Sequence, residues 1–465
     1  MSGEATRISE LVDHLFRREA GRIASRLTRV FGAHRLDLVE DAVQYALVQA
    51  LQHWPYQGVP DNAHAWLTRV ASNRALDVVR ADRKLRSLDA DETAGLQEEV
   101  DALTVAAAQD QLKFAKELED EQLGLMFVCC HPALPRAASV ALTLKVVCGF
   151  GVTEIARAFL SNEATIAQRL VRAKRLIREQ QISFEVPAPE ALPGRLDPVL
   201  EVLYLFFTEG YAPTAGDRLV KEDLCAEAIR LTGLLAANPS ASRPECHALR
   251  ALMLFQAARF ASRTDAAGDL LLLEEQDRSL WDRSMISLGL MHLEQAAAGE
   301  RLTPYHLQAE IAAIHVAAAR PEDTPWRRIL ELYDLLRDMQ PTAVVLLNRA
   351  IALGKIEGPA AGLAALKSIP RDESPERYPF LPAAEGEFLR NLGRTDEAAA
   401  CFERALELAR TQPERRFIGR KLADLLHDTD GHTSNTVDRD NLDIRRWRPF
   451  MIVARTRIAS TSVFS

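Results

Sequence analysis

Apolar residues recur every three to four positions along most of this chain, which is the period of a helix that buries one face. The segments 11–31, 38–54 and 64–84 show this pattern, and so do 123–181 and 196–427. Runs of Val and Ile that alternate with polar residues, the mark of half-buried strands, are scarce. The pattern therefore predicts an all-α protein.

Interruptions of this pattern mark loops and boundaries. The stretch 54–62 holds two prolines and a glycine, so we expect a loop there, with Asp61 or Asn62 capping the next helix. The segment 87–121 has eleven acidic residues and only two lysines, which indicates a solvated, partly extended linker. Four prolines within 187–198 mark a second boundary.

A pair of short helices is predicted within 153–178. Thr153 can cap the first helix, and Asn162 can cap a second helix that starts at Glu163. Apolar residues at helical spacing give the second helix one face suited to burial. They are Ile166, Leu170, Ala173 and Ile177.

The opposite face of this second helix is polar and basic. It carries Thr165, Gln168, Arg169, Arg172 and Arg175. Between 163 and 178 there are five basic residues and one acidic residue, a local charge of +4. Such a helix fits the major groove of DNA. The same spacing also occurs in ordinary helical bundles with a solvated face, so the pattern alone leaves both interpretations open.

The two earlier helices carry further candidates. On the helix 64–84, the candidate nucleic-acid contacts are Asn73, Arg74, Asp77, Arg80 and Lys84. Six basic and two acidic residues give 69–86 a local charge of +4. On the helix 38–54, Glu40, Asp41 and Gln44 form a polar edge beside an apolar stripe. That edge either docks on another protein or is simply solvated.

Composition limits the possible classes of protein. The 465 residues suffice for about three domains, and the balance of 48% hydrophobic and 26% charged residues excludes a disordered chain. The net charge is −8, so any nucleic-acid site must be local. Six scattered cysteines without a C-x-x-C pair fit a reducing cytoplasm. The N-terminus lacks a signal-peptide pattern, and the apolar stretch 137–152 is too polar to span a bilayer.

No motif for catalysis, metal or cofactor binding stands out. The sequence has no G-x-S-x-G, H-E-x-x-H, G-x-G-x-x-G or phosphate-binding loop, so we expect neither an enzyme nor a cofactor or metal. Cys129-Cys130-His131 lacks a fourth ligand, and we expect buried thiols at a helix end. His292, His306 and His315 lie at unrelated spacings, as surface or core histidines do.

The C-terminal half contains a repeat-like pattern. Residues 391–398 followed by 401–408 resemble one tetratricopeptide repeat, with Gly393 at the turn. Residues 346–353 with 362–366 look like a degenerate copy. We therefore favour an α-helical solenoid of stacked helix pairs over an irregular helical bundle.

Two motifs resemble those of one protein family, in the family's order. The string 153–178, which ends in Arg172-Ala173-Lys174-Arg175-Leu176-Ile177-Arg178, resembles the promoter-reading helix-turn-helix of bacterial sigma factors. Residues 37–44 and 65–80 resemble the second conserved region of extracytoplasmic-function (ECF) sigma factors. The rest of the chain is similar to the long, tetratricopeptide-like helical extension of one ECF subgroup.

The resemblance implies roles for both segments. Asp41 and Gln44 match positions that dock on the β′ clamp helices of bacterial core RNA polymerase, whose β subunit is a further partner. The helix 64–84 and the loop before it would hold the melted, start-proximal promoter strand. The loop 57–62 is then either a pocket for an extruded base or a plain connection. The helix after Asn162 would read the upstream promoter element.

The resemblance also implies a division of the chain. The acidic linker would either thread into polymerase channels that otherwise hold nucleic acid or act as a tether. The extension would regulate activity in place of a separate anti-sigma factor and could bind a protein partner. The expected segments are 8–86 for sigma region 2, 87–121 for the linker, 122–185 for sigma region 4, 196–427 for the extension and 428–465 for a mobile tail.

The sequence thus predicts a promoter-specificity subunit of bacterial RNA polymerase, acting in the cytoplasm without a membrane partner. The alternative is a helix-turn-helix activator that binds duplex DNA and signals through its repeats without acting as a sigma subunit. That alternative leaves residues 37–80 without a role.

Overall fold

Helices make up the regular structure of the chain. The computed structural model describes residues 19–86, 95, 97–102, 121–158, 161–185, 187, 190–211, 222–266, 268–369, 378–409 and 411–430. Within these ranges there is no strand, and one isolated antiparallel bridge joins Thr264 and Leu270. The predicted all-α fold is confirmed.

The chain divides into two compact units. The first contains the chain up to Leu205 and the short stretch 237–241, and the second contains most of the chain beyond Leu205. The division falls within one continuous helix, α9 (Leu192–Tyr211).

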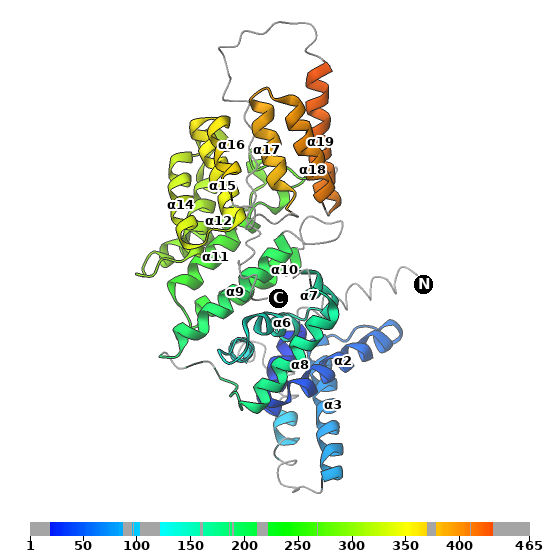
Figure 1. The fold of residues 1–465 in the computed structure, drawn as a ribbon. Coiled ribbons are helices and arrows are strands. Elements are labelled where there is room, and N and C mark those ends of the chain that lie inside the picture. The colour runs from blue at the N-terminus through cyan, green and yellow to red at the C-terminus, as the bar shows by residue number, and fades with distance from the viewer. Residues whose placement is uncertain are drawn as a thin grey trace. The chain divides into compact units, whose positions relative to one another are not determined.

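The first unit holds the two segments that resemble sigma-factor regions. A helix over 19–31 is followed by η1 (Ala33–Arg35) and by the packed pair α2 (Leu36–Gln57) and α3 (Ala63–Arg86) (Figure 1). After a helix over 121–129 come α6 (Arg136–Val146), α7 (Val152–Ala158) and α8 (Glu163–Glu179), with α6 and α7 both packed on α8.

Helix α2 is longer than the sequence predicts. The expected loop 54–62 is wrong in its first part, because α2 continues through Pro55 to Gln57. Trp54 is buried and packs edge-on against Trp66 of α3, with 5.4 Å between ring centroids. Burial of this large ring favours continuing the helix despite the hydrogen bond that proline removes.

Short capping contacts set where two helices begin. Asn62 accepts a hydrogen bond of 2.9 Å from the Ala65 N–H, as expected for the cap of α3. Asn162 accepts one of 2.7 Å from the Thr165 N–H and caps α8. Thr153 is not a cap, because α7 already begins at Val152.

The buried stripe of α8 is confirmed, since Ile166, Leu170, Ala173 and Ile177 are all buried. The sequence predicts a solvated, partly extended linker over 87–121. Residues 97–102 are helical, and Glu121 is only 4% exposed, so the prediction of a solvated linker is wrong at Glu121. Its carboxylate lies 2.7 Å from the Arg29 guanidinium and 3.6 Å from that of Arg26. The carboxylate does not face solvent, and its two cationic partners compensate for the lost hydration. The rest of the linker lies outside the described residues.

Helix α9 begins earlier than the expected start of the extension at 196. Pro193 lies in its first turn and Pro198 inside it, so these prolines do not end a unit. The Arg195 guanidinium donates a hydrogen bond of 2.6 Å to the Phe127 carbonyl, and Arg136 pairs with Glu201. These contacts attach the first half of α9 to the first unit.

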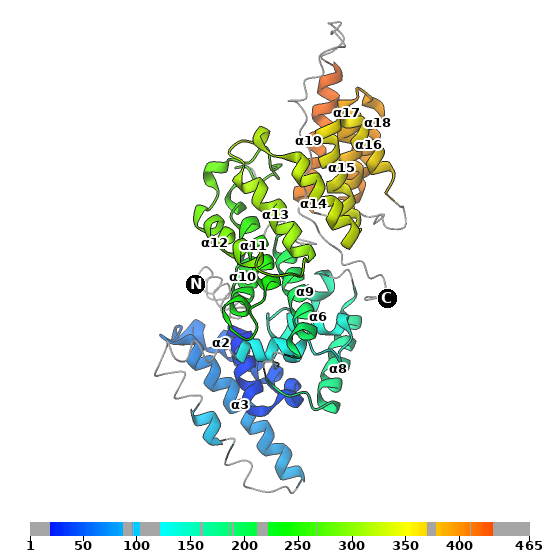
Figure 2. The same cartoon turned by 90° about the vertical axis from the view of Figure 1, so that its left-hand side faces the viewer.

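The second unit is a succession of helices. It contains α10 (Glu222–Ala237), α11 (Pro244–Ala257), η2 (Phe260–Ser262), η3 (Arg278–Leu280), α12 (Arg283–Ala296), α13 (Pro304–Ala317), η4 (Pro321–Asp323), α14 (Trp326–Met339), α15 (Ala343–Glu357), α16 (Pro359–Lys367), α17 (Phe380–Asn391), α18 (Thr395–Leu408) and α19 (Gln412–Asp430). From α14 to α19 each helix packs on the next, as Figure 2 shows.

The turn between α17 and α18 uses Gly393 as the sequence predicts. Its φ of 71° is a backbone conformation that residues with a β-carbon rarely adopt. Phe388 and Phe402 are fully buried in the core that joins α15 to α19. Of the expected tail 428–465, residues 428–430 end α19 and the remainder lies outside the described residues.

Candidate nucleic-acid interface

Helix α8 presents a compact basic face to solvent. Gln168, Arg172 and Arg175 are exposed, whereas Thr165 and Arg169 are half-buried. Burial lowers the pKa of the Arg169 guanidinium, and the Thr165 N–H is bonded to the Asn162 cap. The structure therefore brings three of the five predicted contacts to the centre of the face and places the other two at its flank.

One apolar side chain interrupts this basic face. Val171 is 64% exposed and lies one helical turn after Gln168 and immediately before Arg172. Sequence reasoning missed it, although its place outside the stripe of Ile166 and Leu170 was readable from the helical period. We call Gln168, Val171, Arg172 and Arg175 the α8 face.

Helix α2 exposes a mixed polar and apolar surface. Asp41 and Gln44 are exposed as expected, and beside them lie Tyr45, Val48 and Leu51, exposed by 40%, 47% and 44%. We call these five residues the α2 patch. The Arg74 guanidinium of α3 lies 5.0 Å from the Tyr45 ring centroid and extends the patch.

Glu40 does not belong to the exposed edge where the sequence placed it. Its carboxylate lies 2.6 Å from Lys174 Nζ of α8 and 3.3 Å from Lys145 Nζ of α6. Asp37 lies 2.9 Å from the same Lys174 atom and 2.8 Å from the Arg178 guanidinium. Burial lowers the pKa of Lys174, but the carboxylates outweigh this effect and hold it above the usual value.

Close backbone packing supports these ion pairs within the first unit. Gly21 lies so near Val147 that a β-carbon at residue 21 would come within 1.9 Å of the Val147 carbonyl oxygen. Arg26 and Arg29, which pair with Glu121, lie on the same N-terminal helix as Gly21. The N-terminal helical segment and the helix-turn-helix segment therefore contact one another directly.

Helix α3 carries most of its predicted residues on the surface. Asn73, Arg74, Asp77 and Arg80 are exposed. Arg80 lies 4.0 Å from Asp77 and donates a hydrogen bond to Gln97. Lys84 belongs to α3, but its side chain lies outside the described residues.

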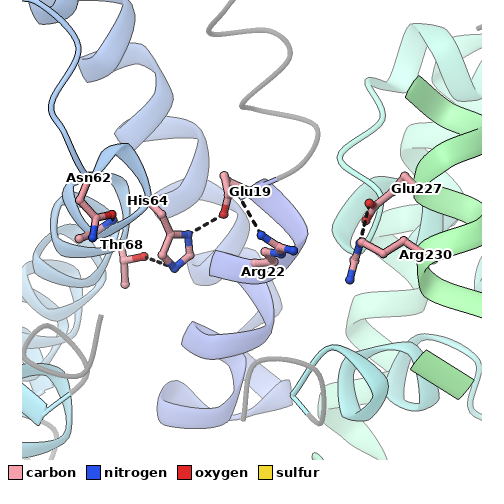
Figure 3. Close-up of polar contacts among 8 residues, drawn as sticks. Glu19, Arg22, Asn62, His64, Thr68, Glu227 and Arg230 are labelled. Atoms are coloured by element: carbon pink, nitrogen blue, oxygen red, sulfur yellow. Dashed lines mark hydrogen bonds and ion pairs between the residues drawn. The ribbon is translucent and has the colours of Figure 1, made fainter. Parts of the chain in front are cut away.

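The loop predicted as a candidate base pocket is one residue shorter in the structure, where residues 58–62 join α2 to α3. Gly58 opens it with a φ of 81°. Tyr56, just before the loop, is 89% exposed and was not among the predicted residues. His64, just after the loop, lies between Glu19 and Thr68 in Figure 3, with 2.6 Å from its Nδ1 to the Glu19 carboxylate and 3.5 Å from its Nε2 to the Thr68 hydroxyl.

The second unit is held by polar contacts of its own. Figure 3 shows Glu227 and Arg230 of α10, whose carboxylate and guanidinium lie 2.8 Å apart. His292 and His315 are buried. Burial lowers the pKa of His292 to about 4 and that of His315 to about 3.

The cysteine pair of the first unit is buried as expected. Cys129 ends the helix over 121–129 and Cys130 follows it, and burial raises the pKa of Cys130 to about 11. Across the part of the chain that the structure describes, no group of three or more His, Cys, Asp or Glu side chains is arranged to hold a metal ion. No described helix has the length and apolar character needed to cross a membrane.

Comparison with known proteins agrees with this arrangement. Three family models match the chain: Sigma-70 region 2 over residues 15–85, Sigma-70, region 4 over 125–177, and a family of unknown function (DUF6596) over 195–297. An uncharacterized protein of Rhizobium meliloti (strain 1021) is 42% identical over 387 residues, which cover 83% of this chain and 90% of that protein. No solved structure matches the chain.

The two sigma-70 matches coincide with the segments that carry the α2 patch and the α8 face. They assign the chain to transcription initiation of the sigma-factor type, with core RNA polymerase and promoter DNA as its partners. The chain belongs to the sigma-70 family, as an ECF-like sigma factor with a C-terminal extension.

Proposed function

We propose that this chain directs bacterial core RNA polymerase to a specific set of promoters and that its C-terminal extension regulates this activity. The observation that carries the proposal is the α8 face, a solvent-exposed basic surface on the second helix of a helix-turn-helix. The polymerase performs all catalysis in this scheme.

The α8 face supports contact with the upstream promoter element. Gln168 can pair with an adenine edge in the major groove, and Arg172 can pair with guanine or phosphate. Arg175, one turn further on, suits a phosphate contact that sets the register of the helix. Thr165 and Arg169 flank this face and would contribute less.

The α2 patch supports docking on the β′ clamp helices. Exposed apolar side chains inside a polar rim are the composition of a protein interface. Tyr45, Val48 and Leu51 provide the apolar part. Asp41 and Gln44 provide the polar part and can pair with basic residues of the partner.

The surface of α3 supports contact with the melted, start-proximal strand. Asn73, Arg74, Arg80 and Lys84 would contact the backbone, while Asp77 moderates the positive charge. A base extruded from the duplex needs a stacking partner and a binding site. The exposed ring of Tyr56, near the end of α2, is the proposed stacking partner, and the loop 58–62 is the proposed site for the base.

The extension supports a regulatory role through its architecture. Successive packing from α14 to α19 is typical of tetratricopeptide-like solenoids, which bind protein partners along an extended surface. The proposed division keeps 87–121 as the linker and 428–465 as the tail. The chain would act in the cytoplasm, where the polymerase works.

Transcription in vitro tests the main proposal. The purified full-length chain is mixed with sigma-free core polymerase and genomic fragments, and transcript starts are mapped. Discrete starts that share paired upstream elements are expected. A chain that neither binds core polymerase nor produces starts, with or without its extension, would instead favour the activator that acts without a sigma role.

Two truncations test the regulatory role of the extension. A chain that ends at Tyr211 keeps the contacts of Arg195 and Glu201 with the first unit, whereas a chain that ends at Glu185 loses them. The chain that ends at Tyr211 is expected to remain folded and to differ from the full chain in activity. Equal activity of a folded 211-residue chain and the full chain would remove the regulatory role.

A further inference from the structure

One apolar residue of the α8 face, Val171, lies outside the buried stripe of the helix. Val171 is 64% exposed, while the buried stripe of the helix is complete without it. Single exposed apolar residues are common on protein surfaces, so exposure alone means little. The position of Val171, among Gln168, Arg172 and Arg175, is what calls for an explanation.

Small neighbouring side chains leave Val171 accessible at the surface of α8. Ala167 and Ala164, one and two turns earlier, are both exposed and small. A recognition helix contacts base edges mainly through its N-terminal residues, and small side chains there let the helix approach the bases closely. Val171 follows these two alanines on the same side of the helix, nine residues into a helix of 17.

The major groove offers one apolar group for such a side chain. Thymine presents its 5-methyl group there, and none of the other three bases carries a methyl group at that edge. Residues three apart on a helix are separated by about 4.5 Å along its axis, close to the rise of about 3.4 Å between base pairs. Gln168 and Val171 are therefore spaced to contact neighbouring base pairs when the helix runs along the groove.

We infer that Val171 is a specificity-determining residue that reads the 5-methyl group of a thymine in the upstream promoter element, next to the base pair contacted by Gln168. The inference rests on the proposed promoter-binding function and adds a base preference to it. The upstream element must then contain a thymine whose replacement by deoxyuridine, which removes only the methyl group, weakens recognition.

The experiment uses holoenzyme assembled from core polymerase and the full-length chain. Duplexes of the mapped upstream element carry deoxyuridine in place of one thymine at a time, and their affinities are compared by competition. One position is expected to lose affinity about fourfold, which corresponds to ~0.8 kcal/mol for one buried methyl-sized group.

A substitution on the protein side assigns that loss to one side chain. The Val171→Ala chain should bind the thymine and deoxyuridine duplexes equally at that position. The matched control is Leu335→Ala, which shortens an apolar side chain of α14 that is 45% exposed, and it should retain the fourfold preference. Because Val171 is exposed and Ala is the better helix former, the variant should fold normally.

The outcomes separate this inference from the proposed function. Specific promoter binding with no thymine preference, or a preference that survives Val171→Ala, overturns the reading by Val171 while leaving the sigma-factor function intact. Absence of any specific upstream binding overturns both. A preference present in the unmodified chain and lost only in Val171→Ala supports the inference.

Discussion

The Glu40 carboxylate of α2 lies 2.6 Å from Lys174 Nζ of α8. The pair joins the sigma region 2 segment to the helix that carries the α8 face, and both side chains are largely shielded from water, at 19% and 13% exposure. An ion pair this enclosed interacts more strongly than a surface pair, and losing one partner leaves the other charge poorly solvated. This contact is therefore expected to hold the two segments together.

Removing either partner should destabilise the first unit. Lys174→Met and Glu40→Gln are each expected to lower the free energy of unfolding, with a coupling of about 0.5–3 kcal/mol in the double variant. Urea unfolding of the three variants measures the coupling. Because the folded pKa of Lys174 is raised, this stabilisation is present below the usual lysine pKa and is lost as pH rises through the raised value. If the losses of stability in the two single variants simply add up in the double variant, the pair does not hold the two segments together.

Arginines at the centre and flank of the α8 face should differ in effect. Arg172→Ala is expected to lower affinity for the upstream element and to reduce the slope of log K against log salt by about 0.9, one phosphate contact. Arg169→Ala should change the slope less, because Arg169 is half-buried. Binding titrations at several salt concentrations measure both slopes. Unchanged affinity and slope in Arg172→Ala would exclude this face from DNA contact.

Reversing one charge on the α2 patch should abolish binding to core polymerase. Asp41→Lys places a cation where the partner's basic residues are expected, and it should leave the fold intact because Asp41 is exposed. Asp424→Lys on α19 makes the same change at another exposed position and serves as the control. Co-elution with core polymerase is the measurement, and retained binding of Asp41→Lys would refute the docking role.

The exposed ring of Tyr56 should matter for promoter melting. Tyr56→Ala is expected to reduce formation of the open promoter complex by the worth of one base stacked on an aromatic ring, about 1–3 kcal/mol. Tyr56→Phe keeps the ring and should behave like the unmodified chain. Permanganate reactivity of unpaired thymines reports the melted fraction. Equal melting by Tyr56→Ala would leave the loop as a plain connection.

Mild acid should destabilise the second unit through two buried histidines. The pKa of His292 is lowered to about 4 and that of His315 to about 3, chiefly by burial and then by nearby arginines. Below about pH 6.5 these two histidines bind protons in the unfolded chain but stay neutral in the folded chain. The free energy of unfolding therefore falls as pH drops, by about 2 kcal/mol for each histidine at pH 5.

Unfolding measured between pH 7.5 and pH 5 tests this prediction. The His315→Leu chain should show a flatter dependence on pH, whereas His427→Gln, at an exposed position of α19, should match the unmodified chain. Equal pH dependence in His315→Leu would mean that this histidine is not kept neutral by folding.

Local patterns were sufficient for much of the first unit. The period of Ile166, Leu170, Ala173 and Ile177 determined which face of α8 is buried, and Asn162 determined where the helix begins, because both depend only on residues within a few turns. The expected loop 54–62 failed at its start for a different reason. Burial of Trp54 against Trp66 involves another helix, and no local pattern encodes that contact.

The sequence by itself determined the all-α class, the order of the two sigma-like segments and the basic character of α3 and α8, since these depend on residue types and short-range spacing. Only the tertiary structure decided that Glu40 is paired with Lys174, and that Leu51 and Val171 are exposed on the surface. Side-chain burial and ion pairing between distant segments depend on how helices pack, and helical periodicity alone does not specify that packing.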